Sequence, residues 1–201
     1  TSLKCCIVTF TNVAKKNALS IDVLEQLTTL FNKHATDSSI HSIILTGANE
    51  STNKKSKRNS FFSAGSNLSF FNNFSQGASN DDLVQGFNKA ASIANSFILA
   101  LANFPKPIIA AANGHALGLG ALLLLHCDFV YMVQYATFLT PFSLIGIHAE
   151  GGSSLLYPLA MGKQFASEPM HAAKTLQAKD LLTMRMVNSL YESEEQVLAE
   201  A

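Results

Sequence analysis

The stretch "NGHALGLGALLLLHCD", residues 113–128, places three glycines in front of a run of alanine and leucine. The run is apolar enough for a buried helix, but packing alone does not require glycines before a helix. Gly118 and Gly120 flank Leu119 where the helix should begin, so the unpaired N–H groups of its first turn face outward with the positive end of the helix dipole. The stretch therefore predicts backbone donors that stabilise a developing negative charge.

The rest of the chain alternates between predicted strands and helices. Short β-branched, apolar runs closed by turn residues are typical of buried strands, and apolar residues three and four apart are typical of a helix. Ser20 is expected to cap the first helix, whose apolar positions recur at helical spacing: Val23, Leu24, Leu27, Leu30 and Phe31. The alternation predicts an α/β fold with parallel strand pairing. The predicted strands cover 3–10, 40–47, 108–114 and 128–133, and a second long helix covers 81–103.

The composition indicates one globular domain with a small appendage, since 201 residues with 48% hydrophobic and 14% charged content can bury a sizeable core. Fourteen basic residues balance fourteen acidic ones, so no global field favours nucleic acid or an anionic membrane. The apolar stretches at 108–112 and 117–125 are shorter than the ~20 residues of a membrane span. The three cysteines form no CxxC pair and are expected to be buried thiols in a reducing compartment. The histidines lack metal-ligand spacing, so no metal is expected.

A second glycine turn, "SAGSNL" at 63–68, also follows an apolar pair and offers another backbone donor beside Gly65. Each glycine turn alone is a weak signal, since tight packing explains most of them. A polar insert at 48–60 carries a basic run among serine and asparagine. This run predicts either a solvated loop or a contact with a ligand phosphate. Its cations are Lys54, Lys55, Lys57 and Arg58.

Four motifs, by their order and spacing, carry a family resemblance that covers nearly the whole chain. They are "KKNALSIDVLEQL" (15–27), "FFSAGSNL" (61–68), "PKPIIAAANGHALGLGALLLLHCDFVY" (105–131) and "GIHAEGGSSLLYPLAMG" (146–162). The chain resembles the crotonase superfamily of enoyl-CoA hydratases and isomerases. The resemblance implies a crotonase-like spiral of repeated ββα units over residues 1–163. It also implies that residues 164–201 begin a C-terminal helical trimerisation region, whose remainder is truncated or unordered.

The resemblance further implies an acyl-CoA thioester as substrate and two backbone N–H groups that form an oxyanion hole. The matching donors are Ser66 and Leu119, which act through the main chain, so the identity of their side chains matters little. No cofactor is implied beyond the coenzyme A of the substrate. The acidic residue that usually follows the first donor is Asn67 here. The implied substrate-binding residues are Ala64, Gly65, Ser66, Asn67, Leu68, Gly118, Leu119, Phe142, Lys15 and Lys16, with the basic insert as the alternative phosphate contact.

The positions of the carboxylate side chains distinguish hydratases from isomerases in this family. A hydratase has glutamates at the positions of Leu122 and Phe142, and this chain lacks both. Glu150 instead precedes a Gly-Gly pair in "HAEGG", the placement found in peroxisomal-type delta-3, delta-2-enoyl-CoA isomerases. One carboxylate suffices to carry a proton from the α carbon of a 3-enoyl thioester to its γ carbon. For this work Glu150 should lie in an apolar pocket that raises its pKa. The expected walls are Phe138, Leu139, Phe142, Leu144 and Ile147.

Other interpretations of these residues stay open. The dipole of the following helix would also stabilise Glu150, and His148 is close enough in sequence to tune it. Asp128 is expected to fix the fold rather than to react. The resemblance favours an isomerase that converts 3-enoyl-CoA to trans-2-enoyl-CoA in β-oxidation, as a homo-oligomer (trimer or dimer of trimers), in the peroxisome or otherwise the mitochondrion. The alternatives are a hydratase-type enzyme and a non-catalytic acyl-CoA-binding or assembly subunit.

Overall fold

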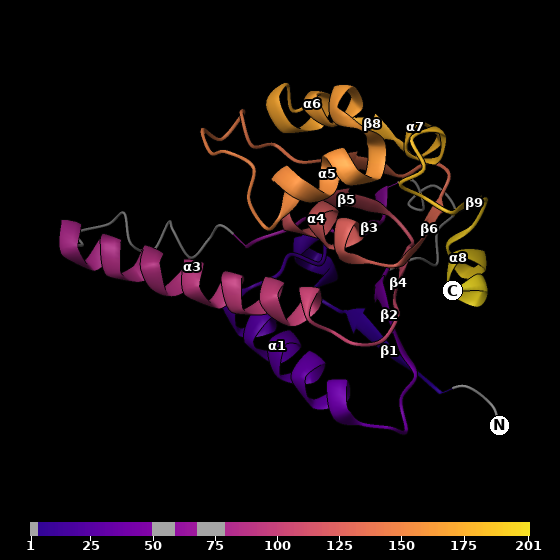
Figure 1. Ribbon diagram of the computed structural model, residues 1–201, viewed down its shortest axis with the longest axis horizontal. Helices are drawn as coiled ribbons and strands as arrows, with labels where there is room; N and C mark the ends of the chain where they lie inside the picture. The colour runs from indigo at the N-terminus through magenta and orange to yellow at the C-terminus, as the bar shows by residue number, and fades with distance from the viewer. Residues whose placement is uncertain (1–3, 50–58, 68–78) are drawn as a thin grey trace.

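The computed structural model of the chain describes residues 4–49, 59–67 and 79–201, which form two sheets with helices packed around them (Figure 1). The larger sheet has the strand order β1-β2-β4-β6-β9, and all neighbouring strands run parallel. The four strands predicted from apolar runs are confirmed as β1, β2, β4 and β6. The bounds in this sheet are β1 Cys5–Phe10, β2 Ser42–Gly47, β4 Ile108–Ala112, β6 Phe129–Val133 and β9 Ser189–Tyr191.

The smaller sheet has the strand order β3-β5-β7-β8, in which only the pair β7 and β8 is antiparallel. The described elements repeat one pattern, in which the chain adds a strand to each sheet and then forms a helix: β2-β3-α3, β4-β5-α4 and β6-β7-α5. The predicted α/β fold of repeated ββα units is therefore confirmed. The bounds in this sheet are β3 Phe61–Ser63, β5 His115–Leu117, β7 Thr137–Leu139 and β8 Leu176–Gln177.

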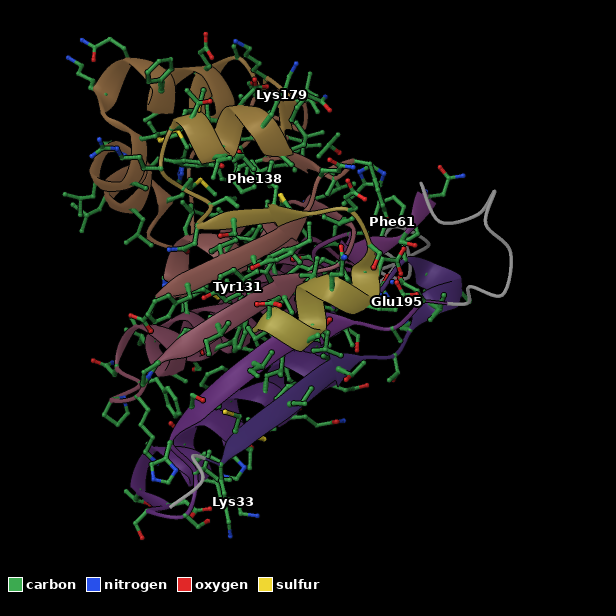
Figure 2. The ribbon with its side chains drawn as sticks, turned by 90° about the vertical axis from the view of Figure 1, so that its right-hand side faces the viewer. Lys33, Phe61, Tyr131, Phe138, Lys179 and Glu195 are labelled. Atoms are coloured by element: carbon green, nitrogen blue, oxygen red, sulfur yellow. The ribbon has the colours of Figure 1, made fainter. Side chains whose placement is uncertain are left out.

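The helices cover both sides of the larger sheet. Helices α1 and α3 pack against each other on one side, and α8 lies across the other, where it contacts β4, β6 and β9 (Figures 1 and 2). The first half of α3 extends away from the sheets (Figure 1). The bounds are η1 Val13–Lys15, α1 Ile21–Thr36, α3 Asn80–Ala102, α4 Leu119–His126, α5 Ser153–Met161, α6 Lys163–His171, α7 Ala178–Thr183 and α8 Glu194–Glu200.

Helix α1 begins and packs as its sequence predicts. The Ser20 hydroxyl accepts the backbone N–H of Val23 at 3.4 Å, which confirms the predicted cap. Phe31 makes edge-on ring contacts with Phe97 of α3 at 6.3 Å and with Phe104 at 5.1 Å. Such aromatic pairs add about 1 kcal/mol each beyond the burial of their area, so they fix α1 against α3 and against the segment that follows α3.

Helix α4 has no polar face. Every residue from Leu119 to Leu124 is buried, and the helix contacts β3, β5 and α5. A helix that is apolar all round must be enclosed by protein, since any exposed side would leave hydrocarbon in water. The first turn of α4 is therefore held on every side, and the position of its backbone N–H groups is fixed by the surrounding packing.

Two buried asparagine side chains tie together the loops at the carboxyl ends of the strands. Asn17 donates to the carbonyls of Ala48 at 2.9 Å and Phe61 at 2.8 Å. Asn113 donates to the carbonyl of Gly47 at 2.5 Å and accepts the N–H of the same residue at 3.1 Å. These bonds replace water around buried backbone groups that the sheets leave unpaired.

Asp128 joins β4 to β6. Its carboxylate accepts the N–H of Ile108 at 2.8 Å, and its own N–H donates to the carbonyl of Ile108 at 2.8 Å. The prediction that Asp128 fixes the fold is confirmed.

The cysteines are free thiols, and the expected burial is only partial for Cys6 and Cys127. Burial raises the pKa of the Cys127 thiol above its ordinary value. Cys5 is exposed, so the expectation of buried thiols is wrong for this residue. The reason is its place on β1, an edge strand on which Cys5, Ile7 and Thr9 face away from the core.

Residues 164–201 contribute to both sheets. Strand β8 pairs with β7, and β9 pairs with β6 in the register Tyr131 to Ser189. The division of the chain at residue 163 stays a prediction.

Candidate active site

The first glycine turn follows β3 and exposes the N–H of Ser66. The N–H of Leu19 donates to the carbonyl of Gly65, and the N–H of Asn67 donates to the carbonyl of Leu19, each at 2.8 Å. In this parallel bridge the two bonds flank Ser66, so its own N–H points to the opposite side. No group in the described part of the chain accepts that N–H.

The second glycine turn leads from β5 into α4. Gly118, with φ of 50°, is the cap of α4, and its N–H donates to the carbonyl of Leu139 at 2.8 Å. The first bond of the helix runs from the N–H of Leu122 to the carbonyl of Gly118 at 3.0 Å. The N–H of Leu119 precedes that bond, and among the described residues nothing accepts it.

The two turns lie in direct contact, and glycine is what permits the contact. A Cβ on Gly65, which has φ of 84°, would lie 2.8 Å from the nitrogen of Leu119. A Cβ on Gly120 would lie 2.5 Å from the carbonyl oxygen of Ser63. Any side chain at either glycine would force the turns apart. The structure thus places the turn of Gly65 and Ser66 against the backbone of Leu119. That the N–H groups of Ser66 and Leu119 bind one oxyanion stays a prediction.

Glu150 lies on the turn that precedes α5. The residue is exposed overall, yet the neighbouring protein removes part of the water from its carboxyl, and this desolvation raises its pKa above the ordinary value. The positive charge of His148 acts in the opposite direction. The direction of the shift suits a carboxylate that must accept a proton near neutral pH.

The turn of Glu150 packs on the flank of α4. A Cβ on Gly151 would lie 3.1 Å from a methyl of Leu122 and 3.5 Å from a methyl of Ile98. Leu122 is 1% exposed and Phe142 is 2% exposed, so both hydratase positions hold buried hydrocarbon. The first turn of α4 therefore carries the free N–H of Leu119 at its end and the turn of Glu150 on its side.

Sequence reasoning missed two side chains that hold this turn. The Ser153 hydroxyl donates to the carbonyl of Glu150 at 2.5 Å, and Nε2 of His126 lies 2.8 Å from the carbonyl oxygen of Gly151. The signal for His126 is its spacing from Leu122, because residues four apart share one face of a helix. No local sequence pattern predicts that His126 has its hydrogen-bond partner 25 residues further along the chain.

The expected phosphate contacts lie beside the first turn. Lys15 ends η1, and the carbonyl of Lys16 accepts the N–H of Ala64 at 2.9 Å. Nζ of Lys16 lies 4.8 Å from the centre of the Phe61 ring, an attractive contact between a cation and an aromatic face. The expected contact Leu68 and the basic insert at 54–58 lie outside the described residues.

The expected apolar walls are only partly enclosed. Phe138 and Phe142 are buried, whereas Leu144 is 72% exposed and Ile147 is 43% exposed. Both exposed residues lie in the turns between β7 and α5, where the described chain places no other element over them.

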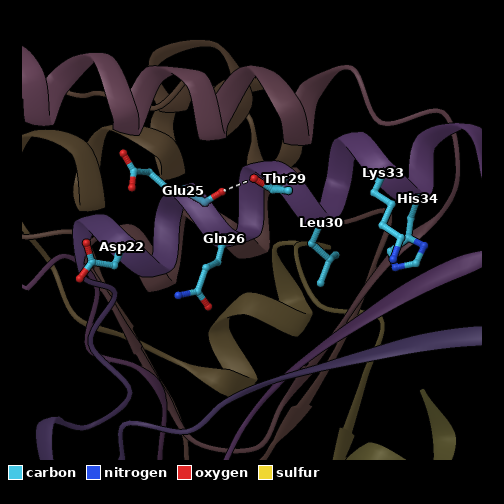
Figure 3. A pocket seen from close by; sticks show the side chains of 7 residues that line it. All are labelled: Asp22, Glu25, Gln26, Thr29, Leu30, Lys33 and His34. Atoms are coloured by element: carbon cyan, nitrogen blue, oxygen red, sulfur yellow. Dashed lines mark hydrogen bonds between the residues drawn. The ribbon is translucent and has the colours of Figure 1, made fainter.

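A shallow hollow of about 470 Å³ lies elsewhere, along α1, and contains none of the predicted site residues (Figure 3). Its lining residues are Asp22, Glu25, Gln26, Thr29, Leu30, Lys33 and His34.

No helix in the described segments has the length and apolarity needed to cross a bilayer. Nor do three His, Cys, Asp or Glu side chains gather in those segments as a metal ion would require.

Comparison with known proteins agrees with this geometry. Residues 2–201 match the family described as Enoyl-CoA hydratase/isomerase. The chain belongs to this family. A solved enoyl-CoA hydratase from Polaromonas sp. JS666 superimposes with a TM-score of 0.82 at 27% identity, covering 100% of this chain and 72% of that one. The crotonase fold predicted from the motifs is therefore confirmed.

Several relatives in the enoyl-CoA hydratase/isomerase family are isomerases by name. Enoyl-CoA delta isomerase 2 of Rattus norvegicus is 30% identical over 92% of this chain and 43% of its own length. The peroxisomal Enoyl-CoA delta isomerase 3 of Mus musculus is 28% identical over 92% of this chain and 53% of its own length. A relative that is not named as an isomerase, Testis-specific chromodomain protein Y 1 of Homo sapiens, is 30% identical over 92% of this chain and 32% of its own length. The chain spans about half or less of the length of these relatives.

Proposed function

We propose that this enoyl-CoA hydratase/isomerase family member converts 3-enoyl-CoA to trans-2-enoyl-CoA in the β-oxidation of unsaturated fatty acids. The position of Glu150 carries the proposal. Its turn packs on Leu122, one helical turn after the free N–H of Leu119, and hydrocarbon occupies the positions where a hydratase has its glutamates. A single carboxylate beside two backbone donors fits proton transfer within one substrate better than the activation of water.

In the proposed reaction, the Glu150 carboxylate removes a proton from the α carbon of the thioester. The electron pair of the C–H bond forms a dienolate, and negative charge moves onto the thioester oxygen. The N–H groups of Ser66 and Leu119 donate to that oxygen, each contributing ~3 kcal/mol to transition-state stabilisation. The protonated Glu150 then returns the proton to the γ carbon, which leaves the double bond in conjugation. The step balances without an added redox or metal group, so we propose no cofactor beyond the coenzyme A of the substrate.

The family relationship also supports proposals about the cellular location and the oligomeric state of the protein. We propose a peroxisomal location, because one relative is named as a peroxisomal isomerase. We also propose a homo-oligomer, a trimer or a dimer of trimers, because the family resemblance implies one. Exposed apolar side chains on α5 and α6 are in keeping with an oligomer, because two of them lie four residues apart on one face of α5 and contiguous apolar surface commonly marks an interface. They are Leu155, Leu159 and Phe165.

The test of the function is Glu150→Gln, assayed with purified protein and a 3-enoyl-CoA. The amide keeps the shape of the side chain but accepts no proton, so we expect turnover to fall about 10²- to 10⁴-fold while acyl-CoA affinity stays within several-fold. Formation of 2-enoyl-CoA and of 3-hydroxyacyl-CoA is followed separately. Near-normal turnover of the variant would contradict the role of Glu150. Formation of 3-hydroxyacyl-CoA would indicate a hydratase. If the unaltered chain forms neither product, the protein is a binding subunit and not an enzyme.

The pH profile gives an independent check of Glu150. The base must be ionised, and desolvation raises its pKa, so activity should fall with decreasing pH at a midpoint above the ordinary glutamate value of 4.5. In His148→Gln the opposing positive charge is lost, so the pKa of Glu150 rises further and the acid limb should move to higher pH. A limb that stays in place would show that His148 does not act on this carboxyl.

A further inference from the structure

His126 connects the two parts of the proposed active site. It is the last residue of α4, the helix that begins with Leu119, and its Nε2 lies 2.8 Å from the carbonyl oxygen of Gly151. A carbonyl oxygen only accepts, so this nitrogen carries the hydrogen and donates. The bond therefore joins the end of α4 to the residue that follows Glu150.

The turn of Glu150 has few other attachments. Gly151 and Gly152 have φ of 59° and 77°, a left-handed conformation that glycine adopts with little strain and with little restraint. Ser153 donates to the carbonyl of Glu150 through both its hydroxyl and its backbone N–H, and His126 donates to the next carbonyl along the chain. A Cβ on Gly152 would lie 3.6 Å from Cε1 of His126, so the imidazole ring also packs against the turn.

We propose that His126 is a positioning residue for the reaction: its Nε2–H holds the carbonyl of Gly151 and thereby aims the carboxylate of Glu150. This inference rests on the proposed function. A proton shuttle must reach two carbons of one substrate, and a shift of about 1 Å in such a group costs up to about 100-fold in rate. Fixing two consecutive carbonyls of a glycine turn limits such a shift.

The half-buried setting of His126 agrees with this role. Burial lowers the pKa of the imidazole, so the ring is neutral at neutral pH. A neutral ring still donates through Nε2, and it adds no positive charge that would make the nearby carboxylate less basic.

The test compares His126→Leu with His126→Gln. Leucine fills similar space without a donor, whereas the glutamine amide can present an N–H near the position of Nε2. We expect His126→Leu to lower kcat about tenfold with KM within about twofold, because positioning acts on the chemical step. His126→Gln should stay within about threefold of the unaltered kcat. Equal kcat values for the two variants would overturn the proposal, as would an unchanged kcat in His126→Leu.

A double substitution separates positioning from general support of the fold. If His126 acts through Glu150, adding His126→Leu to Glu150→Gln should lower kcat no further. A further tenfold loss would overturn the proposal. If His126→Leu does not fold, as judged by circular dichroism, His126→Met serves as the variant without a donor, and the same outcomes apply.

The same experiments distinguish the two levels of inference. If Glu150→Gln turns over normally, the proposed function fails, and the role of His126 fails with it. If Glu150→Gln is inactive while His126→Leu keeps full kcat, only the positioning role fails.

Discussion

Two glycine turns meet at α4, and they are held in different ways. The turn at Gly118 is part of the packed main chain: its N–H pairs with the carbonyl of Leu139, and the next side chain, Leu119, is 6% exposed. The turn at Gly151 is partly exposed, and the side chains of His126 and Ser153 hold it together with one backbone bond, from the N–H of Ser153 to the carbonyl of Glu150. A backbone donor built into such packing tolerates many side chains, whereas a catalytic side chain on a lightly held turn depends on a few specific contacts.

The largest effect expected from this comparison is at Leu119→Pro. Proline is tolerated at the first position of a helix, so α4 should form, but the N–H is lost. We expect kcat to fall about 10²- to 10³-fold. The matched control is Leu119→Met, which keeps the N–H and nearly the same buried volume, and should keep most of the turnover. A comparable loss in both variants, with circular dichroism unchanged, would count against Leu119 as a donor.

An intermediate effect is expected at Gly151→Ala. The positive φ costs about 1–2 kcal/mol for a residue with a Cβ, and here the new methyl also meets Leu122 at 3.1 Å. Gly146→Ala is the control, because Gly146 has φ of 72° and nothing lies within 4 Å of a Cβ there. Denaturant unfolding should show the cost of the positive φ in both variants, and a larger total loss of stability in Gly151→Ala because of its contact with Leu122. Only Gly151→Ala should also lower kcat, by several-fold, because it moves the turn of Glu150. An equal kcat in both would mean that this turn need not be held.

The smallest effect is expected for replacement of Lys15 and Lys16 together by alanine. An exposed contact with phosphate is screened by salt and contributes about 1 kcal/mol, so KM should rise several-fold with kcat nearly unchanged. The rise should shrink at high ionic strength. If deletion of residues 53–58 raises KM more than the double substitution does, the basic insert is the main phosphate contact.

The parts of the fold that could be predicted are those with a local signal. Strand β2 is centred on three consecutive apolar residues, Ile43 to Leu45, and Ser20 precedes a helical spacing of leucines, so both are visible in the sequence. Strands β3, β5 and β7 have three residues each, which is too short for any periodicity, and the strand predicted over 108–114 ends before β5 begins.

The candidate site was predicted to a similar extent. Two glycine turns and one carboxylate stood out from the residues and the family motifs. The contact of Gly65 with Leu119 depends on pairing between distant strands, and the bond of His126 to Gly151 depends on how an irregular turn folds back on α4. Neither has a local pattern, because both arise only when the sheets have assembled.

The two hydrogen bonds between the Asn113 side chain and the backbone of Gly47 affect how fast this asparagine can deamidate. Asn113 precedes Gly114, and an asparagine before glycine readily loses ammonia when the next backbone nitrogen attacks its amide carbon. Here the amide is buried, and both of its polar atoms are bonded to Gly47. Ring closure requires those bonds to break, so the folded chain protects its own most labile dipeptide. The rate of deamidation at Asn113 is therefore expected to depend on how often the hydrogen bonds between the ends of β2 and β4 open.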